Sequence, residues 1–207
     1  MATDQLSLLD DDNSVERIQL NNADIRYYHR FITDHQAWFE RLVSELQWQQ
    51  SQIYIHGKTI AIPRLNAWYG DEGADYAYSG HQLVRHPWTA SLKQLKSQLE
   101  QHLNCTFNSV LANYYRDGND SVSWHADDEA ELGEQPLIAS LSFGDSRRFS
   151  LKAKATDSAN RKPVHIDLAS GSLLVMAGTT QQYYHHQIAK TRHSVAGRVN
   201  LTFRTIV

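Results

Sequence analysis

The spacing of hydrophobic residues divides the chain into a helical first half and a β-rich second half. After residue 34, apolar side chains recur at i, i+3, i+4 and i+7, which places them on one face of an amphipathic helix. They are Phe39, Leu42, Val43 and Leu46, and Thr33 or Asp34 can cap the helix. A second helix is predicted after Pro87, where leucines share one face: Leu92, Leu95, Leu99 and Leu103.

From Thr106 onward the helical spacing gives way to short β-rich runs separated by turn residues. The runs are 107–115, 137–143, 149–152, 164–168, 172–177, 183–188 and 198–206. Turn signals such as Asp117-Gly118-Asn119 and Ser170-Gly171 separate them. The segment 53–80, rich in Tyr, Trp and Gly, is interpreted as strands and loops. This order of elements predicts an α+β protein whose core is an antiparallel sandwich or jelly roll.

The length of the chain fits one domain, because 207 residues can bury a sizeable core. Residues 1–14 are acidic and are expected to form a disordered tail, so that residues 15–207 make a single domain. No apolar run approaches the length of a membrane span, and the acidic start does not resemble a secretory signal. We therefore expect a cytoplasmic protein, monomeric and without a membrane partner.

Cysteine content and charge exclude several classes of protein. Cys105 is the only cysteine, which excludes an intramolecular disulfide and a multi-cysteine zinc site. The formal net charge of -3 excludes a bulk polycation of the histone kind, so contacts with nucleic acid would need local basic patches. Candidate basic residues are Arg147, Arg148, Lys152, Lys154, Arg161 and Lys162, then Lys190 and Arg192. An ordinary solvated surface is the simpler interpretation of both groups.

Two tripeptides have the H-x-D spacing of a metal site, and about one such match is expected by chance. His165-Ile166-Asp167 lies inside a β-run, which puts its histidine and carboxylate on one solvent-facing side of a strand. His125-Ala126-Asp127 instead follows a strand and a turn and begins a polar segment, where side chains can project into a cavity. His125-Ala126-Asp127 is therefore the better candidate for a metal site. Two histidines and one carboxylate form a ligand set that suits non-haem Fe(II).

Two further groups are ambiguous on their spacing alone. His185 and His186 point to opposite faces of a strand, so only one of them can complete a metal site. On the last strand, Arg198, Asn200, Thr202 and Arg204 share one face. Solvated arginines on a half-exposed sheet would explain that face, and so would a pair of arginines that clamps a short dicarboxylate.

Four runs together closely resemble the AlkB family of Fe(II)/2-oxoglutarate-dependent dioxygenases, which repair alkylated nucleic-acid bases. They are Asn113-Tyr114-Tyr115-Arg116-Asp117-Gly118, His125-Ala126-Asp127-Asp128-Glu129, Ile138-Ala139-Ser140-Leu141-Ser142-Phe143-Gly144 and Arg198-Val199-Asn200-Leu201-Thr202-Phe203-Arg204. The resemblance spans residues 50–207 and is nearest to the branch of animal DNA-repair homologues. It implies a double-stranded β-helix (jelly roll) core with N-terminal helices and a nucleotide-recognition lid. Residues 50–105 would form the nucleotide-recognition region and a helix, and residues 106–207 the catalytic core.

The same resemblance implies roles for individual residues and three small-molecule partners: Fe(II), 2-oxoglutarate and O2. His125, Asp127 and His186 would hold the iron. Asn113, Tyr115 and Arg198 would hold the far carboxylate of 2-oxoglutarate, with Asn200 and Arg204 at the end that chelates iron. Glu129 would face the exocyclic amino group of the target base, and Tyr78 would stack on the base with Tyr76 close by. His56 stands where the duplex-preferring relative has an intercalating aromatic residue, which leaves preference for duplex open.

The implied function is oxidative demethylation of alkylated DNA bases such as 1-methyladenine and 3-methylcytosine, releasing formaldehyde and succinate. A base methylated on its pairing edge costs less to extrude from a duplex, and an aromatic face with an acidic group can hold a cationic base. RNA or a protein side chain would need the same iron residues and is an alternative substrate. A metal-bearing module that binds nucleic acid without turnover is the alternative from a different class.

Overall fold

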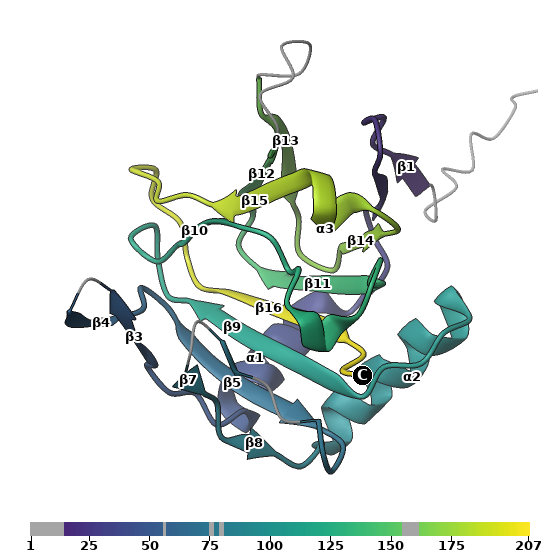
Figure 1. Cartoon of the computed structure of the whole chain (residues 1–207). Helices are drawn as coiled ribbons and strands as arrows, with labels where there is room; N and C mark the ends of the chain where they lie inside the picture. Colours follow the sequence, from purple (N-terminus) through teal and green to yellow (C-terminus); the bar gives the residue numbers. More distant parts are fainter. Residues whose placement is uncertain (1–14, 56, 75–76, 79–80, 155–161) are drawn as a thin grey trace, which may run out of the picture.

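The structure is a computed structural model that describes residues 15–207, apart from residues 56, 75–76, 79–80 and 155–161. The side chains of residues 53–55, 77–78 and 81–82 also lie outside the description. Two β-sheets face each other, and two helices cover the outer face of the larger sheet (Figure 1). This arrangement confirms the predicted α+β fold with a jelly-roll core.

The larger sheet has eight strands in the order β1-β2-β14-β11-β16-β9-β5-β8. In that order the strands are Val15–Arg17, Asp24–Tyr28, Leu173–Ala177, Ile138–Gly144, Arg198–Arg204, Ser109–Tyr115, Leu65–Gly70 and Arg85–His86. Neighbouring strands are antiparallel except for β5 and β8, which are parallel. β16 therefore lies inside the sheet between β11 and β9, which explains why all of its residues are buried.

The smaller sheet has four antiparallel strands in the order β10-β15-β12-β13. These strands are Val122–His125, Tyr184–Ile188, Arg147–Ala153 and Val164–Leu168. A cluster of buried apolar side chains occupies part of the space between the two sheets, among them Tyr115, Phe149, Leu168, Met176 and Ile188. Because strand residues alternate between faces, β14 contributes Met176 to this cluster and Val175 to the core on the other side of its sheet.

The outer face of the larger sheet packs against α1 (His35–Glu45) and α2 (Ala90–Leu103). The Thr89 hydroxyl caps α2 by accepting a hydrogen bond from the Leu92 amide at 3.2 Å. Asp34 is the N-cap residue of α1, but its side chain makes no capping bond. All four residues of the predicted apolar stripe pack in this core, although the helix ends one residue before Leu46 and Trp38 is an additional buried residue.

All seven β-rich runs of the second half are strands, with ends that differ by up to two residues. The prediction of strands after the helices alone was nevertheless incomplete. β1 and β2 precede α1, and β2 pairs with β14, nearly 150 residues later in the chain. β2 is only five residues long, so its own pattern of alternating burial carries little signal.

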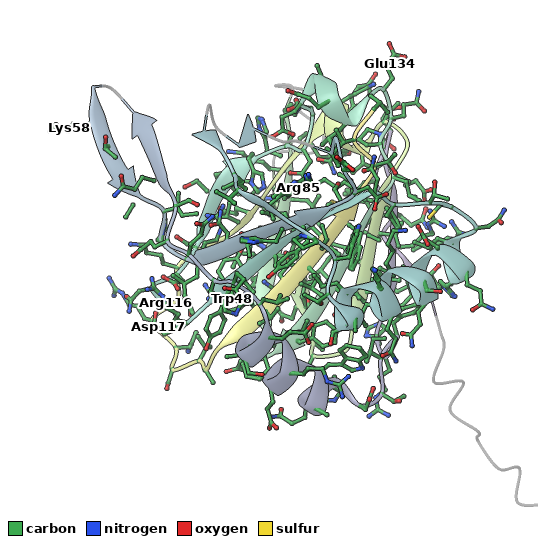
Figure 2. All side chains as sticks on the ribbon, turned by 90° about the horizontal axis from the view of Figure 1, so that it is seen from below. Trp48, Lys58, Arg85, Arg116, Asp117 and Glu134 are labelled. Atoms are coloured by element: carbon green, nitrogen blue, oxygen red, sulfur yellow. The ribbon has the colours of Figure 1, made fainter. Side chains whose placement is uncertain are left out.

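The remaining elements are short. The hairpins are β3 (Gln52–Ile55) with β4 (Lys58–Ala61) and β6 (Ala77–Tyr78) with β7 (His81–Gln82). Figure 2 shows the β3–β4 hairpin, which carries Lys58, standing away from the sheets. A 3-10 helix, η1 (Ala130–Leu132), and a single turn, α3 (Thr180–Tyr183), complete the described chain. Within that part of the chain, no helix has the length and apolar character needed to cross a membrane.

Candidate active site

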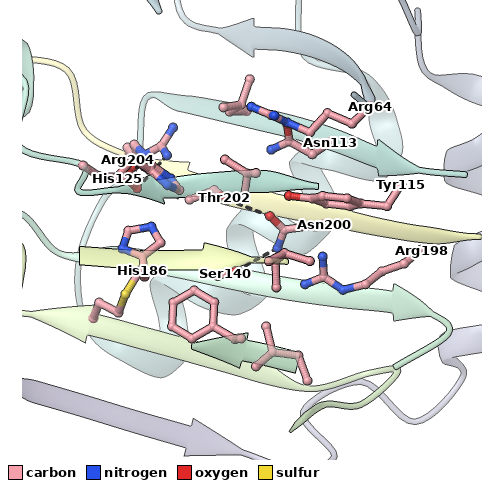
Figure 3. A pocket seen from close by; sticks show the side chains of 17 residues that line it. Arg64, Asn113, Tyr115, His125, Ser140, His186, Arg198, Asn200, Thr202 and Arg204 are labelled. Carbon is pink, nitrogen blue, oxygen red and sulfur yellow. Dashed lines mark hydrogen bonds and ion pairs between the residues drawn. The ribbon is translucent and has the colours of Figure 1, made fainter. Parts of the chain in front are cut away.

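Strands of both sheets line one cavity between them, and the cavity contains all eight residues assigned to iron and 2-oxoglutarate (Figure 3). β9 contributes Asn113 and Tyr115, β10 and β15 contribute His125 and His186, Asp127 follows β10, and β16 contributes Arg198, Asn200 and Arg204. Alternation along β16 puts its polar residues on the cavity side and Val199, Leu201 and Phe203 in the core beneath the helices. The structure thus brings together residues that lie up to 91 positions apart, from Asn113 to Arg204.

Strand pairing brings the three candidate metal ligands together. His125 and His186 are directly paired between β10 and β15, and their ring centroids are 4.2 Å apart. One ligand atom from each of His125, Asp127 and His186 lies within 4.8 Å of the others. Two imidazoles and one carboxylate at this separation fit an iron(II) ion with open coordination positions.

Hydrogen bonds orient two of the three ligands, His125 and Asp127. Nδ1 of His125 lies 2.8 Å from the Ser123 carbonyl oxygen, so Nδ1 carries the proton and donates, which leaves the Nε2 lone pair for a metal. The Asp127 amide donates to the side-chain oxygen of Gln181 at 3.0 Å. Nη2 of Arg204 donates to Oδ2 of Asp127 at 2.7 Å, and the other carboxylate oxygen, Oδ1, lies 3.7 Å from Nε2 of His125.

The protonation states of the buried ligands suit metal binding. Burial opposes ionisation of Asp127, but the positive charge of Arg204 and the nearby histidines outweigh it and hold the pKa of this carboxyl well below its usual range. Burial, together with the neighbouring His125, lowers the pKa of His186 to about 3. At neutral pH the carboxylate is therefore charged and the His186 imidazole neutral, which are the forms that coordinate a metal.

The competing histidines lie elsewhere. His185 is half-buried on the opposite face of β15 and does not line the cavity. His165 and Asp167 are exposed on the outer face of β13, as predicted. There Nδ1 of His165 is 2.8 Å from the Ser150 hydroxyl, and Asp167 accepts a hydrogen bond from Nε of Arg148 at 3.0 Å.

Arg198 is a buried cation whose donors are only partly used. It is 1% exposed, and its Nη2 donates to the Ser142 hydroxyl at 2.9 Å. Nε and Nη1 have no hydrogen-bond partner among the described residues. Burial lowers its pKa to about 10, so it is charged at neutral pH. A buried guanidinium with unused donors fits a carboxylate ligand, and this burial contradicts the alternative of solvated arginines on the last strand.

The side-chain donors of Asn200, unlike those of Arg198, all have hydrogen-bond partners. Its Nδ2 donates to the Ser140 hydroxyl at 2.8 Å and to the Leu141 carbonyl at 3.0 Å, and its Oδ1 accepts from the Thr202 hydroxyl at 3.0 Å. Both N–H groups of the amide are therefore occupied. Asn200 ties β16 to β11 beside the cavity, and its donors already have partners in this structure.

Several residues of the site were not predicted from the sequence. Arg64, Ser140 and Thr202 line the cavity, and Gln181 supports Asp127 from α3. Thr202 lies on the polar face of the last strand, which was a usable signal. Gln181 lies among polar residues with no periodicity, and its contact with Asp127 bridges 54 positions, so the sequence gives no signal for it.

Of the four residues assigned to base recognition, only Glu129 has a described side chain, and it is not among the residues that line the cavity. Glu129 is half-buried and immediately precedes η1. Tyr78 lies on β6, but its side chain is outside the description, and Tyr76 and His56 are outside the described residues altogether.

One predicted basic patch needs correction. Arg147 is 3% exposed, and its guanidinium donates to the carbonyls of Asp117, Asp120 and Ala189. It is a buried structural cation, because its donors replace water at three backbone groups. Lys190 and Arg192 are exposed, as the sequence suggested.

Comparison with known proteins shows the family to which the chain belongs. The model of the 2OG-Fe(II) oxygenase superfamily matches residues 24–204. Alpha-ketoglutarate-dependent dioxygenase alkB homolog 3 of Rattus norvegicus is 44% identical over 173 residues, which cover 81% of this chain and 58% of that protein. DNA oxidative demethylase ALKBH2 of Mus musculus is 39% identical over 163 residues, which cover 76% of this chain and 67% of that protein.

The match therefore spans less than two thirds of the length of the rat relative. The solved structure of OsALKBH1 has the same fold, with a TM-score of 0.63 at 15% identity, over 93% of this chain and 100% of that one. The superfamily match and these relatives identify the chain as a member of the AlkB family within the 2OG-Fe(II) oxygenase superfamily.

Proposed function

We propose that the protein is an Fe(II)/2-oxoglutarate-dependent dioxygenase that demethylates alkylated DNA bases such as 1-methyladenine and 3-methylcytosine, releasing formaldehyde and succinate. The observation that carries the proposal is the cavity itself. It combines a His-Asp-His ligand group with a buried arginine that has unused donors. The relatives named as a dioxygenase and as a DNA oxidative demethylase support the reaction and the substrate class.

In this proposal, residues of the chain bind the iron and 2-oxoglutarate and orient the iron ligands. His125, Asp127 and His186 hold the iron, while Arg204 fixes the carboxylate of Asp127 through their 2.7 Å ion pair. Arg198 binds the far carboxylate of 2-oxoglutarate, with Asn113 and Tyr115 beside it. Iron with 2-oxoglutarate and O2 supplies the oxidant for the methyl carbon.

Recognition of the base is assigned to residues near the iron site. Glu129 comes two positions after Asp127, which places an acidic group close to the metal ligands. Tyr78 is proposed to stack on the flipped base, with Tyr76 close by, and His56 to occupy the place of the wedge that enters a duplex. Stacking on one aromatic ring lowers the free energy of binding by about 1–3 kcal/mol per base.

The central experiment incubates the protein with Fe(II), 2-oxoglutarate and oligonucleotides that carry 1-methyladenine or 3-methylcytosine, and follows loss of the methyl group by mass spectrometry. His165→Ala is the matched control for His125→Ala, because both change the histidine of an H-x-D tripeptide. We expect repair by wild type and His165→Ala and none by His125→Ala. Repair of methylated RNA or peptide in place of DNA would contradict the proposed substrate.

A second experiment tests base recognition. Tyr78→Ala and Glu129→Ala are expected to lower demethylation of the oligonucleotide about tenfold, while the slow, substrate-independent consumption of 2-oxoglutarate continues. His56→Phe is expected to favour duplex over single-stranded substrate. Full activity of both pocket variants on methylated DNA would contradict these roles.

A further inference from the structure

We propose that Arg64 is a positioning residue, which holds the Asn113 amide with its N–H donors facing the co-substrate cavity. The inference rests on the proposed function, because it concerns how the cavity binds 2-oxoglutarate. Arg64 and Asn113 lie side by side in the lining of the cavity (Figure 3). Their contact was not expected from the sequence.

Arg64 is fixed from several directions. It lies between β4 and β5 and is 4% exposed, so its guanidinium must be hydrogen-bonded to offset its loss of hydration. Its Nε donates to Oδ1 of Asn113 at 2.8 Å, and its Nη1 donates to the Ser121 carbonyl at 3.1 Å. The Ser121 amide in turn donates to the Pro63 carbonyl at 2.8 Å, which holds the two backbone segments together.

This contact determines which way the Asn113 amide faces. A guanidinium has only donors, so the group that Asn113 turns toward Arg64 must be its oxygen. Nδ2 of Asn113 is then directed away from Arg64, and it makes no hydrogen bond within the described part of the chain. A carboxylate in the cavity needs donors. The flipped amide would present an oxygen to that carboxylate and repel it.

Charge adds to the effect of orientation. The ionised side chains among the described residues of the lining are the guanidiniums of Arg64, Arg198 and Arg204 and the carboxylate of Asp127. An excess of cations in a buried cavity suits a dianion. Lysine in place of Arg64 retains the positive charge but loses the planar pair of donors, so it separates charge from orientation.

The test measures binding of 2-oxoglutarate to the Mn(II)-loaded protein by calorimetry, without turnover. Arg64→Lys is expected to raise the Kd of 2-oxoglutarate about tenfold, and Arg64→Met, which also loses the charge, to raise it further; both should leave the Kd of Mn(II) unchanged. In an Asn113→Ala background, Arg64→Lys should add less than twofold, because it keeps the charge and a residue that acts through Asn113 has nothing left to position. Arg148→Lys is the control, since this guanidinium donates to Asp167 on the exposed face of the smaller sheet, and its Kd for 2-oxoglutarate should equal that of wild type.

Unchanged 2-oxoglutarate affinity in the folded Arg64 variants would overturn the inference, and so would full additivity with Asn113→Ala. Thermal melts establish which variants fold. If Arg64→Met does not fold, the test relies on Arg64→Lys. Failure of the wild-type protein to bind 2-oxoglutarate at all would overturn the proposed function instead, so the two failures are distinguishable.

Discussion

Two of the iron ligands, His125 and Asp127, depend on neighbours that do not themselves reach the metal position. The Ser123 carbonyl selects the tautomer of His125, Gln181 accepts from the Asp127 amide, and Arg204 holds one oxygen of the Asp127 carboxylate. Such supporting contacts affect metal affinity because they fix the direction of the ligand lone pairs. The ligands themselves have a spacing that can be recognised in the sequence, whereas Gln181 contacts Asp127 only because α3 and the segment after β10 meet in the fold.

We expect that His125→Ala, Asp127→Ala or His186→Ala abolishes turnover and iron binding, because each removes one of three protein ligands. The measurement is iron content after reconstitution, followed by demethylation of a methylated oligonucleotide. His185→Ala, on the opposite face of β15, should retain iron. Equal iron loss in the His185 and His186 variants, or loss in the His185 variant alone, would contradict the assignment.

Arg198→Ala is expected to raise the 2-oxoglutarate requirement at least tenfold and to spare iron binding. It removes a charge-assisted bond to a carboxylate, an interaction of about 1.5–3 kcal/mol. The variant also leaves a cavity between the sheets, so Arg198→Lys accompanies it as the less disruptive change. Titration of 2-oxoglutarate with iron content measured in parallel tests this role, which unchanged co-substrate affinity would contradict.

At the scale of elements, seven strands of the second half could be predicted because their β-rich runs are bounded by turn residues, whereas the four-residue β10 was not among the predicted runs. β1 and β2 could not be predicted, since three and five residues carry little periodicity and β2 is stabilised by pairing with distant β14. The pairing of β10 with β15, which sets His125 opposite His186, is non-local in the same way. The candidate ligands were therefore predictable, but the geometry that unites them was not.

The turn between β9 and β10 is held together by the carboxylate of Asp120. This carboxylate is 4% exposed and accepts hydrogen bonds from the backbone amide, Nε and Nη2 of Arg116. Burial opposes its ionisation, but the bonds from Arg116 prevail and lower the pKa of Asp120 below the usual value. The folded state therefore binds a proton at the Asp120 carboxylate less readily than the unfolded state does. As a result, the ionised carboxylate stabilises the fold above a pH of about 4.

We expect Asp120→Asn to lower the free energy of unfolding by about 1–3 kcal/mol at pH 7. The difference from wild type should shrink as the pH falls below about 4, where the wild-type carboxylate becomes protonated and loses the same stabilisation. Urea unfolding at pH 7 and at pH 3 measures this. Asp117→Asn in the same turn is the control, because Asn can replace the oxygen that accepts from the Asn119 amide. A difference independent of pH would contradict the role of the charge.

At the scale of the whole molecule, the larger sheet separates an apolar core from the cavity that contains the candidate site. The helices and the outer face of the larger sheet form an apolar core, whereas the space between the sheets contains the buried charges. β16 connects the two, because its alternate residues belong to the core and to the cavity. Exposed cations near the strands that carry the site are therefore better placed to meet a nucleic acid than those on the helices.

Lys190 and Arg192 lie in the segment between β15 and β16, and both are exposed. If they contact phosphates, Lys190→Ala and Arg192→Ala should each reduce the salt dependence of DNA binding, lowering the slope of log K against log salt by about 1. The loss should be equal for methylated and unmethylated oligonucleotides, because phosphate contacts do not depend on base identity. Lys93→Ala is the matched control, since Lys93 is exposed on α2 at the opposite side of the larger sheet and should leave the slope unchanged. The measurement is DNA binding at several salt concentrations. Equal slopes for wild type and the Lys190 and Arg192 variants would contradict a nucleic-acid contact at this segment. An equal decrease in slope for Lys93→Ala would contradict it as well.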